Sequence, residues 1–174
     1  MKVWFASDLH FQHKNIIRLT QRPFSDINKM NETIIANFNS VVASDDMLYI
    51  LGDVNFKGNA DKLIPRLNGR KVLVQGNHDK DYDPSAFEEI CMIKEIVVPV
   101  SGRNYRFVLC HYPFAEWNGF YKGAIHLHGH QHNKADYNEA QRAAGLLRYD
   151  VGVDANNFMP VSAEQIVRFF KLDS

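Results

Sequence analysis

Residues 71–79 have the sequence KVLVQGNHD, in which an apolar run ends at a glycine followed by three polar side chains. The run over 71–75 is rich in β-branched and apolar residues, which predicts a buried strand. Asn77, His78 and Asp79 follow at once, and each can bind a metal ion or move a proton. This strand therefore ends in side chains suited to chemistry, and the rest of the chain repeats the arrangement.

Four other short polar segments also follow apolar runs. They are Asp8-Leu9-His10, Gly52-Asp53, His111 and Gly129-His130-Gln131-His132. Carboxylates and imidazoles are costly to gather in one place unless a cation compensates them. A chain that repeatedly ends its strands in such groups is therefore expected to build a metal site.

The order of the predicted elements indicates an α/β layered fold with helices on the outside. Ile34, Phe38, Val41 and Val42 recur at helical spacing, as do Leu63, Ile64 and Leu67, and Ser162 with Gln165 forms a capping-box pattern before a last helix. Three segments, 79–86, 112–123 and 133–146, are expected to be irregular. Strands are predicted over 3–6, 47–51, 71–75, 96–100, 105–110, 125–128 and 147–153.

Length and composition place the chain among ordinary globular domains. Its 174 residues fit one domain over 1–174, and 45% of them are hydrophobic. Twenty basic residues balance twenty acidic ones, so a stable complex with nucleic acid is not expected. No apolar run has the roughly 20 residues that a membrane span needs. Cys91 and Cys110 are expected to be free buried thiols, which makes the cytoplasm the expected compartment.

The polar segments contain oxygen and nitrogen donors in a suggestive order. Asp8 and His10 lie two residues apart after a strand, so both can face one side. Asp53 can bridge two cations through its two oxygens. Mixed nitrogen and oxygen ligation without thiolate favours Mn, Fe, Zn, Co or Ni over calcium. The remaining donors are the Asn77 amide oxygen and the imidazoles of His111, His130 and His132.

With these motifs in order, the chain resembles the calcineurin-like metallophosphoesterase superfamily, in particular its small single-domain bacterial and phage branch. The superfamily pattern D-x-H, G-D, G-N-H-[DE], H and G-H-x-H is matched within residues 3–132. The resemblance implies a layered sandwich of two mixed β-sheets flanked by helices, with two bound divalent transition-metal ions, Mn²⁺ first and Fe, Ni, Zn or Co as alternatives. The implied ligands of the first ion are Asp8, His10, Asp53 and His132. Those of the second are Asp53, Asn77, His111 and His130.

The resemblance also implies an activity, the hydrolysis of phosphodiester bonds, with phosphomonoesters left open as a further substrate class. A metal-bridging hydroxide would attack in line, His78 would act as general acid, and Asp79 would orient the His78 ring. Two alternatives stay open: a metal-dependent nuclease, and a non-catalytic protein-binding scaffold with the same fold. The complete ligand set and the presence of His78 favour the enzyme.

The substrate is less well defined by the sequence. We expect a small phosphoester, nucleotide-like if the aromatic residues after His111 stack on a base, and no membrane partner; the oligomeric state stays open. His13, Asn15 and Arg22 are the candidate substrate contacts; the alternatives are a solvent-exposed helix cap for His13 and a solvated surface charge for Arg22, which is the favoured interpretation of that residue. His126 and His128 alternate with His130 along one strand, where packing beneath the site is favoured over a second role in it.

Overall fold

The first sheet has five strands, four of them parallel. The computed structural model describes residues 1–55, 60 and 62–173. Strand β1 (Val3–Ala6) pairs in parallel with β2 (Met47–Ile50), which pairs with β3 (Arg70–Val74), and that strand with β4 (Glu89–Cys91). The short strand β9 (Val161–Ser162) runs antiparallel to β1, so the order is β4-β3-β2-β1-β9. Because β1, β2 and β3 are parallel, their carboxyl ends meet at one edge.

The second sheet is also mixed. Strands β5 (Ile93–Val100) and β6 (Arg103–Cys110) form an antiparallel hairpin. Strands β7 (Ile125–His128) and β8 (Arg148–Asp150) continue it in parallel to β6, in the order β5-β6-β7-β8. A bridge between Ser7 and Gly152 joins the segments that follow β1 and β8, so the two sheets meet beyond the ends of these strands.

The two sheets pack face to face over a shared apolar core. Phe5 of the first sheet and Phe107 of the second are fully buried, with ring centroids 5.4 Å apart. Val72 and Val74 contribute from the first sheet, and Leu127 from the second. Such interlocking of two inner faces is the usual core of a sandwich.

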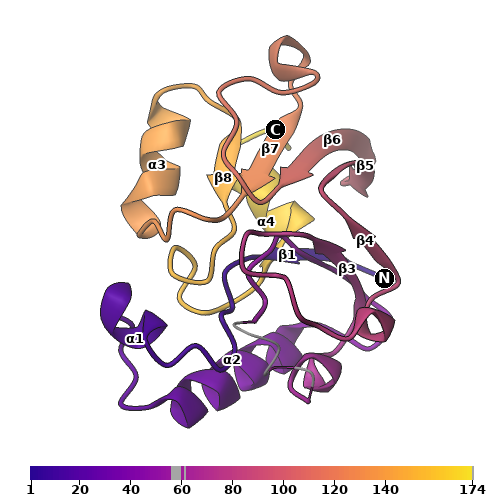
Figure 1. Cartoon of the computed structure of the whole chain (residues 1–174). Coiled ribbons are helices and arrows are strands. Elements are labelled where there is room, and N and C mark those ends of the chain that lie inside the picture. The colour runs from indigo at the N-terminus through magenta and orange to yellow at the C-terminus, as the bar shows by residue number, and fades with distance from the viewer. Residues whose placement is uncertain (56–59, 61, 174) are drawn as a thin grey trace.

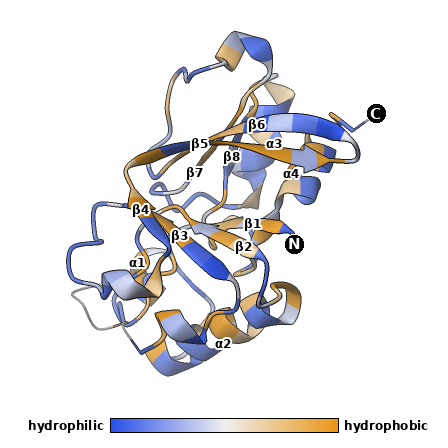
Figure 2. Cartoon of the chain, turned by 90° about the vertical axis from the view of Figure 1, so that its right-hand side faces the viewer, coloured by the Kyte–Doolittle hydropathy of each residue, from blue (hydrophilic) through white to orange (hydrophobic). Residues whose placement is uncertain are grey.

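Helices flank the two sheets, and the longest of them lies on the outer side of the first sheet (Figure 1). The longest, α2 (Ile27–Val41), begins where the Asp26 side chain accepts a hydrogen bond from Lys29 N. Its buried residues Ile34 and Phe38 pack on the outer face of the first sheet, and Figure 2 shows hydrophobic and hydrophilic stretches alternating along it. The other helices are α1 (Ile16–Leu19), α3 (Ala135–Ala143) and α4 (Ala163–Phe169), with 3₁₀ turns at Ile64–Arg66, Pro84–Ala86 and Phe120–Lys122.

The α/β class predicted from the sequence is confirmed, and the seven predicted strands are all found, those over 3–6 and 125–128 with the predicted bounds and the other five with shifted ends. The capping box at Ser162 and Gln165 is also present. The structure corrects three expectations. The helical spacing around residues 63–67 gives only one 3₁₀ turn, α3 lies in the segment 133–146 that was expected to be irregular, and β4 and β9 were not predicted. Asn138 is the one buried residue among the nine of α3. The helix therefore has no apolar stripe by which the sequence could predict it.

In the part of the chain that the structure describes, the helices are all too short or too polar to cross a bilayer.

Candidate metal centre

The predicted metal ligands meet where the parallel strands of both sheets end. Asp8 follows β1, Asp53 follows β2 and Asn77 follows β3. His111 follows β6, and His130 follows β7. Because open parallel sheets place ligand sites beyond the carboxyl ends of their strands, this common edge is the expected position for a site.

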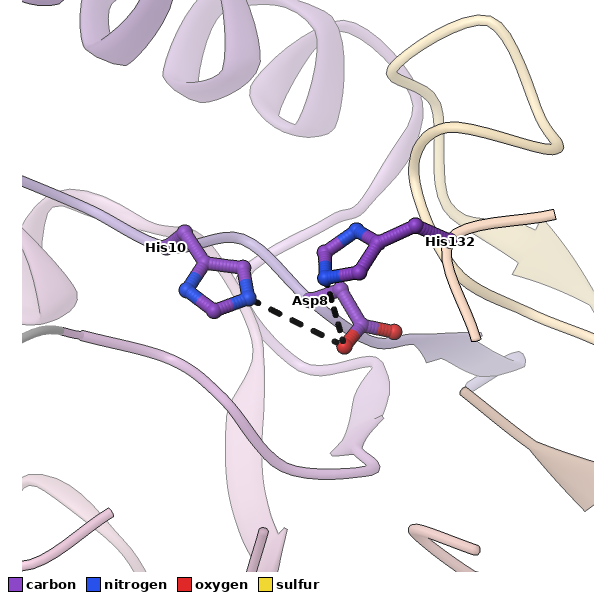
Figure 3. Close-up of side chains that lie close together, drawn as sticks. All are labelled: Asp8, His10 and His132. Carbon is purple, nitrogen blue, oxygen red and sulfur yellow. Dashed lines mark ion pairs between the residues drawn. The ribbon is translucent and has the colours of Figure 1, made fainter. Parts of the chain in front are cut away.

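Asp8, His10 and His132 form the first group of donors (Figure 3). Oδ1 of Asp8 lies 4.0 Å from Nε2 of His10 and 3.9 Å from Nε2 of His132. Nε2 of His10 also lies 3.5 Å from Oδ2 of Asp53. Four potential ligand atoms from three separate segments therefore surround one point.

The second group is centred on Nε2 of His111. This atom lies 3.1 Å from Oδ1 of Asn77, 3.2 Å from Nδ1 of His130 and 3.6 Å from Oδ1 of Asp53. The two oxygens of Asp53 thus face different groups, Oδ2 the first and Oδ1 the second. That is the geometry of a carboxylate that bridges two cations.

The tautomer of His111 shows why a cation fits here. Its Nδ1 lies 2.8 Å from the carbonyl oxygen of Leu51, and because a carbonyl only accepts, Nδ1 carries the proton. With the proton on Nδ1, a neutral ring would direct an Nε2 lone pair toward the oxygens of Asn77 and Asp53. Lone pairs that converge in this way repel one another unless a cation lies between them.

In the first group, an unsatisfied buried nitrogen also indicates that a cation fits. Nε2 of His10 is buried and has no hydrogen-bond partner within the described residues. Buried polar atoms without a partner are rare in native proteins, and coordination of an ion is one way in which such an atom is satisfied. Nitrogen and oxygen donors without thiolate match a first-row transition metal such as Mn, Fe, Co, Ni or Zn.

Burial makes charge expensive at these positions in the protein alone. It raises the pKa of Asp8 to about 7, an effect that the nearby His132 and His111 only partly offset. Burial and the neighbouring His132 hold the pKa of His10 well below its usual range. A bound cation would favour the ionised carboxylate and the neutral imidazole, which are the ligand forms of these side chains.

The backbone at the site is held in an uncommon conformation. Asp8, His10, Asp53, His130 and His132 all have positive φ, between 49° and 71°. Side chains other than glycine seldom adopt this left-handed region, and they persist there when the surrounding structure enforces it. Part of that enforcement is visible, because the amide of Asp8 donates to Gly52 O at 3.0 Å and that of His10 to Asp53 O at 2.9 Å.

His78 lies beside the cluster at its solvent side. Its Nε2 is 4.0 Å from Oδ2 of Asp53, and its side chain is 38% exposed. Its backbone amide donates to Oδ1 of Asp53 at 3.0 Å. The ring is therefore next to the donor groups and open to an incoming molecule.

The hydrogen bonds of the Asp79 carboxylate run to backbone amides. Its Oδ2 accepts from the amides of Asp53 and Gly76, both at 2.8 Å, and its Oδ1 accepts from that of Val54 at 2.9 Å. The buried carboxylate thus ties the loop after β3 to the loop after β2. It fixes where Asp53 lies, because the amides of Asp53 and Val54 both donate to it.

Comparisons with known proteins place the chain among relatives whose names give no activity. An uncharacterized protein of Methanocaldococcus jannaschii, MJ1445, is 36% identical over 176 residues, covering 98% of this chain and 92% of the relative. The chain belongs to the family of that archaeal protein. The gene 66 protein of Mycobacterium phage L5 is 29% identical, covering 75% of this chain and 77% of its own.

The fold recurs in a solved structure. The crystal structure of the protein of unknown function AQ665 from Aquifex aeolicus superposes with a TM-score of 0.74 at 28% identity, covering 96% of this chain and 98% of that one. No protein-family model matches the chain.

Arg22 was predicted to contact substrate, and the structure contradicts this. The side chain is fully buried and forms a two-pronged ion pair with Asp154, with Nε to Oδ1 at 3.0 Å and Nη2 to Oδ2 at 2.8 Å. Its Nη1 and Nη2 also donate to the carbonyl oxygens of Leu9 and Asp8, at 3.1 and 2.7 Å. A guanidinium used in this way inside the protein is not available to a substrate.

The other two predicted substrate contacts lie near the first group. His13 is buried, with its Nδ1 3.3 Å from Nδ1 of His10, so the alternative of a solvent-exposed cap is wrong. Asn15 is exposed and precedes α1, but its side chain makes no capping hydrogen bond, and the helix has only four residues. Substrate contact remains a prediction for both residues.

Two acidic residues hold side chains of the last motif and of the residue after it; the sequence suggests a supporting, non-catalytic position for Asp154 and gives no sign of Asp150. Oδ2 of Asp154 accepts from Nδ1 of His132 at 2.8 Å, and Oδ2 of Asp150 accepts from Nδ2 of Asn133 at 2.8 Å. Both follow or end β8, as the ligands follow their own strands. Their position after a strand was the feature of the sequence that could have indicated a place in the site, although a single Asp at a strand end is weak evidence.

The remaining histidines pack as expected. His126 and His128 are buried on β7, with ring centroids 5.6 Å apart. His126 stacks on Phe114 at 4.9 Å, and His128 lies against Tyr137. Of the aromatic residues after His111, Tyr112 borders the site, with its ring 4.7 Å from that of His130.

Proposed function

We propose that this protein is a two-metal phosphoesterase with the calcineurin-like metallophosphoesterase fold, acting on phosphodiesters and, as a second class, on phosphomonoesters. The observation that carries the proposal is the meeting of nitrogen and oxygen donor atoms around His111 Nε2 and His10 Nε2, with Asp53 shared between them. A complete donor set argues against a non-catalytic scaffold, whose residues have no need to gather such groups.

The chain's side chains divide into two ligand sets. Asp8, His10 and His132 would hold one ion and Asn77, His111 and His130 the other, with Asp53 bridging them. Two divalent cations, when bound, would supply Lewis acidity toward phosphate oxygens and acidify a water molecule. Manganese is our first choice, with Fe, Ni, Zn and Co as alternatives that suit the same donors.

His78 would supply the proton for the leaving group. Its ring borders Asp53 and is partly open to solvent, so it can approach a bound substrate without first leaving a buried position. Proton donation by a positioned side chain typically contributes about 10²–10⁴-fold to the rate. The contribution is largest for poor leaving groups, which a diesterase acting on alkyl esters must expel.

The proposed substrate is a small, nucleotide-like phosphoester. Twenty basic and twenty acidic residues leave no net charge to attract long nucleic acid, which weighs against the nuclease alternative. Tyr112 is 39% exposed next to His130, so a flat group on the substrate could lie against its ring.

The test is hydrolysis of p-nitrophenyl phosphate and bis(p-nitrophenyl) phosphate by metal-stripped protein, titrated with Mn²⁺, Ni²⁺ and Zn²⁺. We expect turnover that requires metal, two ions per chain by elemental analysis, and a preference for the diester. Asp53→Asn is the matched control, because it keeps the shape of the bridging side chain and removes its charge. Turnover that is independent of metal, or equal in Asp53→Asn, would overturn the proposal.

A further inference from the structure

We propose that Arg22 and Asp154 are positioning residues, whose buried ion pair fixes the donor geometry of Asp8, His10 and His132; the proposal rests on the proposed metal binding. The pair joins residues 132 positions apart, with side chains that are 0% and 1% exposed. Burying two charges is expensive, so such a pair is a poor source of stability. Its role is better explained by the groups to which the two side chains form their other hydrogen bonds.

Asp154 determines which nitrogen of His132 faces the site. Its Oδ2 lies 2.8 Å from Nδ1 of His132, so the carboxylate keeps the proton on Nδ1. In the neutral ring, Nε2 then carries the lone pair, and this atom lies 3.9 Å from Oδ1 of Asp8. A carboxylate behind an imidazole also makes it a stronger ligand. In the second group the equivalent partner of His111 is a neutral carbonyl oxygen, that of Leu51.

Arg22 holds the other side of the same group. Its Nη2 donates to the carbonyl of Asp8 and its Nη1 to that of Leu9. These bonds fix the peptide groups between Asp8 and His10, which both have left-handed φ values of 59° and 49°. Because the side-chain directions follow from that backbone, the guanidinium aims both side chains toward His132. One buried cation thus connects the first motif of the chain with the last.

A neutral replacement separates this role from a purely structural one. Buried ion pairs can often be exchanged for apolar side chains of similar volume without loss of stability. The double variant Arg22→Met/Asp154→Leu should therefore fold but lose the hydrogen bonds to His132, Asp8 and Leu9. Asp154→Asn is the conservative single variant, because it keeps an acceptor for His132 and removes the charge. Asp46→Asn is the control, since Asp46 is also buried but bonds Lys2 N and Trp4 Nε1 instead.

Thermal melting first shows whether each variant is folded. The first readout is then the binding of Mn²⁺ to the metal-free protein, measured by calorimetry. Partners of metal-bound histidines are typically worth about 10–100-fold in metal affinity. We expect the double variant to lose that much for one of two ions and to keep the other, Asp154→Asn to lose less, and Asp46→Asn to match the wild type. A folded double variant that binds both ions as the wild type does would overturn the proposal.

The second readout needs no metal. In ¹⁵N NMR spectra of the metal-free protein, we expect His132 to carry its proton on Nδ1 in the wild type and to exchange between both nitrogens in the double variant. An unchanged Nδ1 proton would overturn the positioning role. If the double variant does not fold, Asp154→Asn decides the question by its Mn²⁺ affinity, because its amide oxygen can still hold the proton on Nδ1 of His132; binding of both ions as in the wild type would then overturn the proposal. A wild type that binds no Mn²⁺ would instead defeat the proposed function, while the NMR result would still decide what the ion pair does.

Discussion

Nε2 of His78 lies 4.0 Å from Oδ2 of Asp53, the carboxylate whose two oxygens face the two donor groups. The amide of His78 donates to the other oxygen of the same carboxylate. The residue is therefore fixed to the centre of the cluster by its backbone, while its ring stays 38% exposed. A proton donor in this position would reach a leaving group on the solvent side without belonging to either proposed ligand set.

The substitution His78→Ala tests that role. We expect the variant to keep both metal ions, because none of the predicted ligands changes. Its kcat should fall by about 10²–10⁴-fold on diesters with a poor leaving group such as an alkoxide, because they need the proton most. The loss should be much smaller with p-nitrophenolate, a good leaving group. The measurement is kcat over a series of leaving groups, and a uniform loss across the series would remove His78 from the acid role.

The close approach of Gly76 to the bridging carboxylate gives a second prediction. A Cβ at this position would lie 2.7 Å from Asp53 N, 3.0 Å from His111 Cε1, and would collide with Oδ1 of Asp53. Gly76→Ala must therefore displace ligands that belong to both groups. Since overpacking typically costs about 1–3 kcal/mol, we expect that loss in the free energy of unfolding together with a loss of bound metal.

Gly102→Ala is the matched control for that substitution. Gly102 lies in the turn between β5 and β6, and a Cβ there would have no neighbour within 4 Å among the described residues. Its φ of +80° makes alanine strained, at about 1–2 kcal/mol. We expect comparable destabilisation in urea unfolding but full metal content and activity. Gly76→Ala with normal metal content would contradict the steric argument.

The cluster of donor side chains could be predicted from the sequence because each predicted ligand stands at the end of an apolar run. Asp53 and His111 are examples: the strand before each was predictable, and parallel strands bring such ends together. Asp79 was placed in the site on resemblance, but its bonds to backbone amides depend on how two loops meet. Local sequence patterns do not determine that contact.

The ion pair of Arg22 could not be predicted from the sequence for a related reason. An arginine near a candidate anion site fits substrate binding as well as it fits an ion pair, and its partner Asp154 is 132 positions away. Helix α3 was missed because its packing depends on Asn138, which bonds the backbone of Asp150. Both cases involve buried polar contacts between distant segments, where hydrophobic periodicity carries no signal.

The buried His126 makes the protein sensitive to acid at a point away from the ligands. Its Nδ1 donates to Val108 O at 2.9 Å, and its Nε2 accepts from Phe114 N at 3.0 Å. Burial lowers the pKa of His126 from 6.5 to about 4. Between pH 6.5 and about 4, His126 therefore binds a proton in the unfolded chain but not in the folded one. The stability is fully present above pH 6.5 and is lost as the pH falls toward 4.

Each pH unit within this window should cost about 1.4 kcal/mol for one such group, so His126 should account for about 2 kcal/mol between pH 7.5 and 5. The substitution His126→Gln keeps a donor and an acceptor and does not titrate. We expect it to lower stability at pH 7.5 through poorer packing on Phe114, and to lose about 2 kcal/mol less than the wild type on acidification. Urea unfolding of both metal-free proteins at these two pH values measures the difference. Equal losses would show that His126 is already charged in the folded protein, against its burial and its hydrogen bonds.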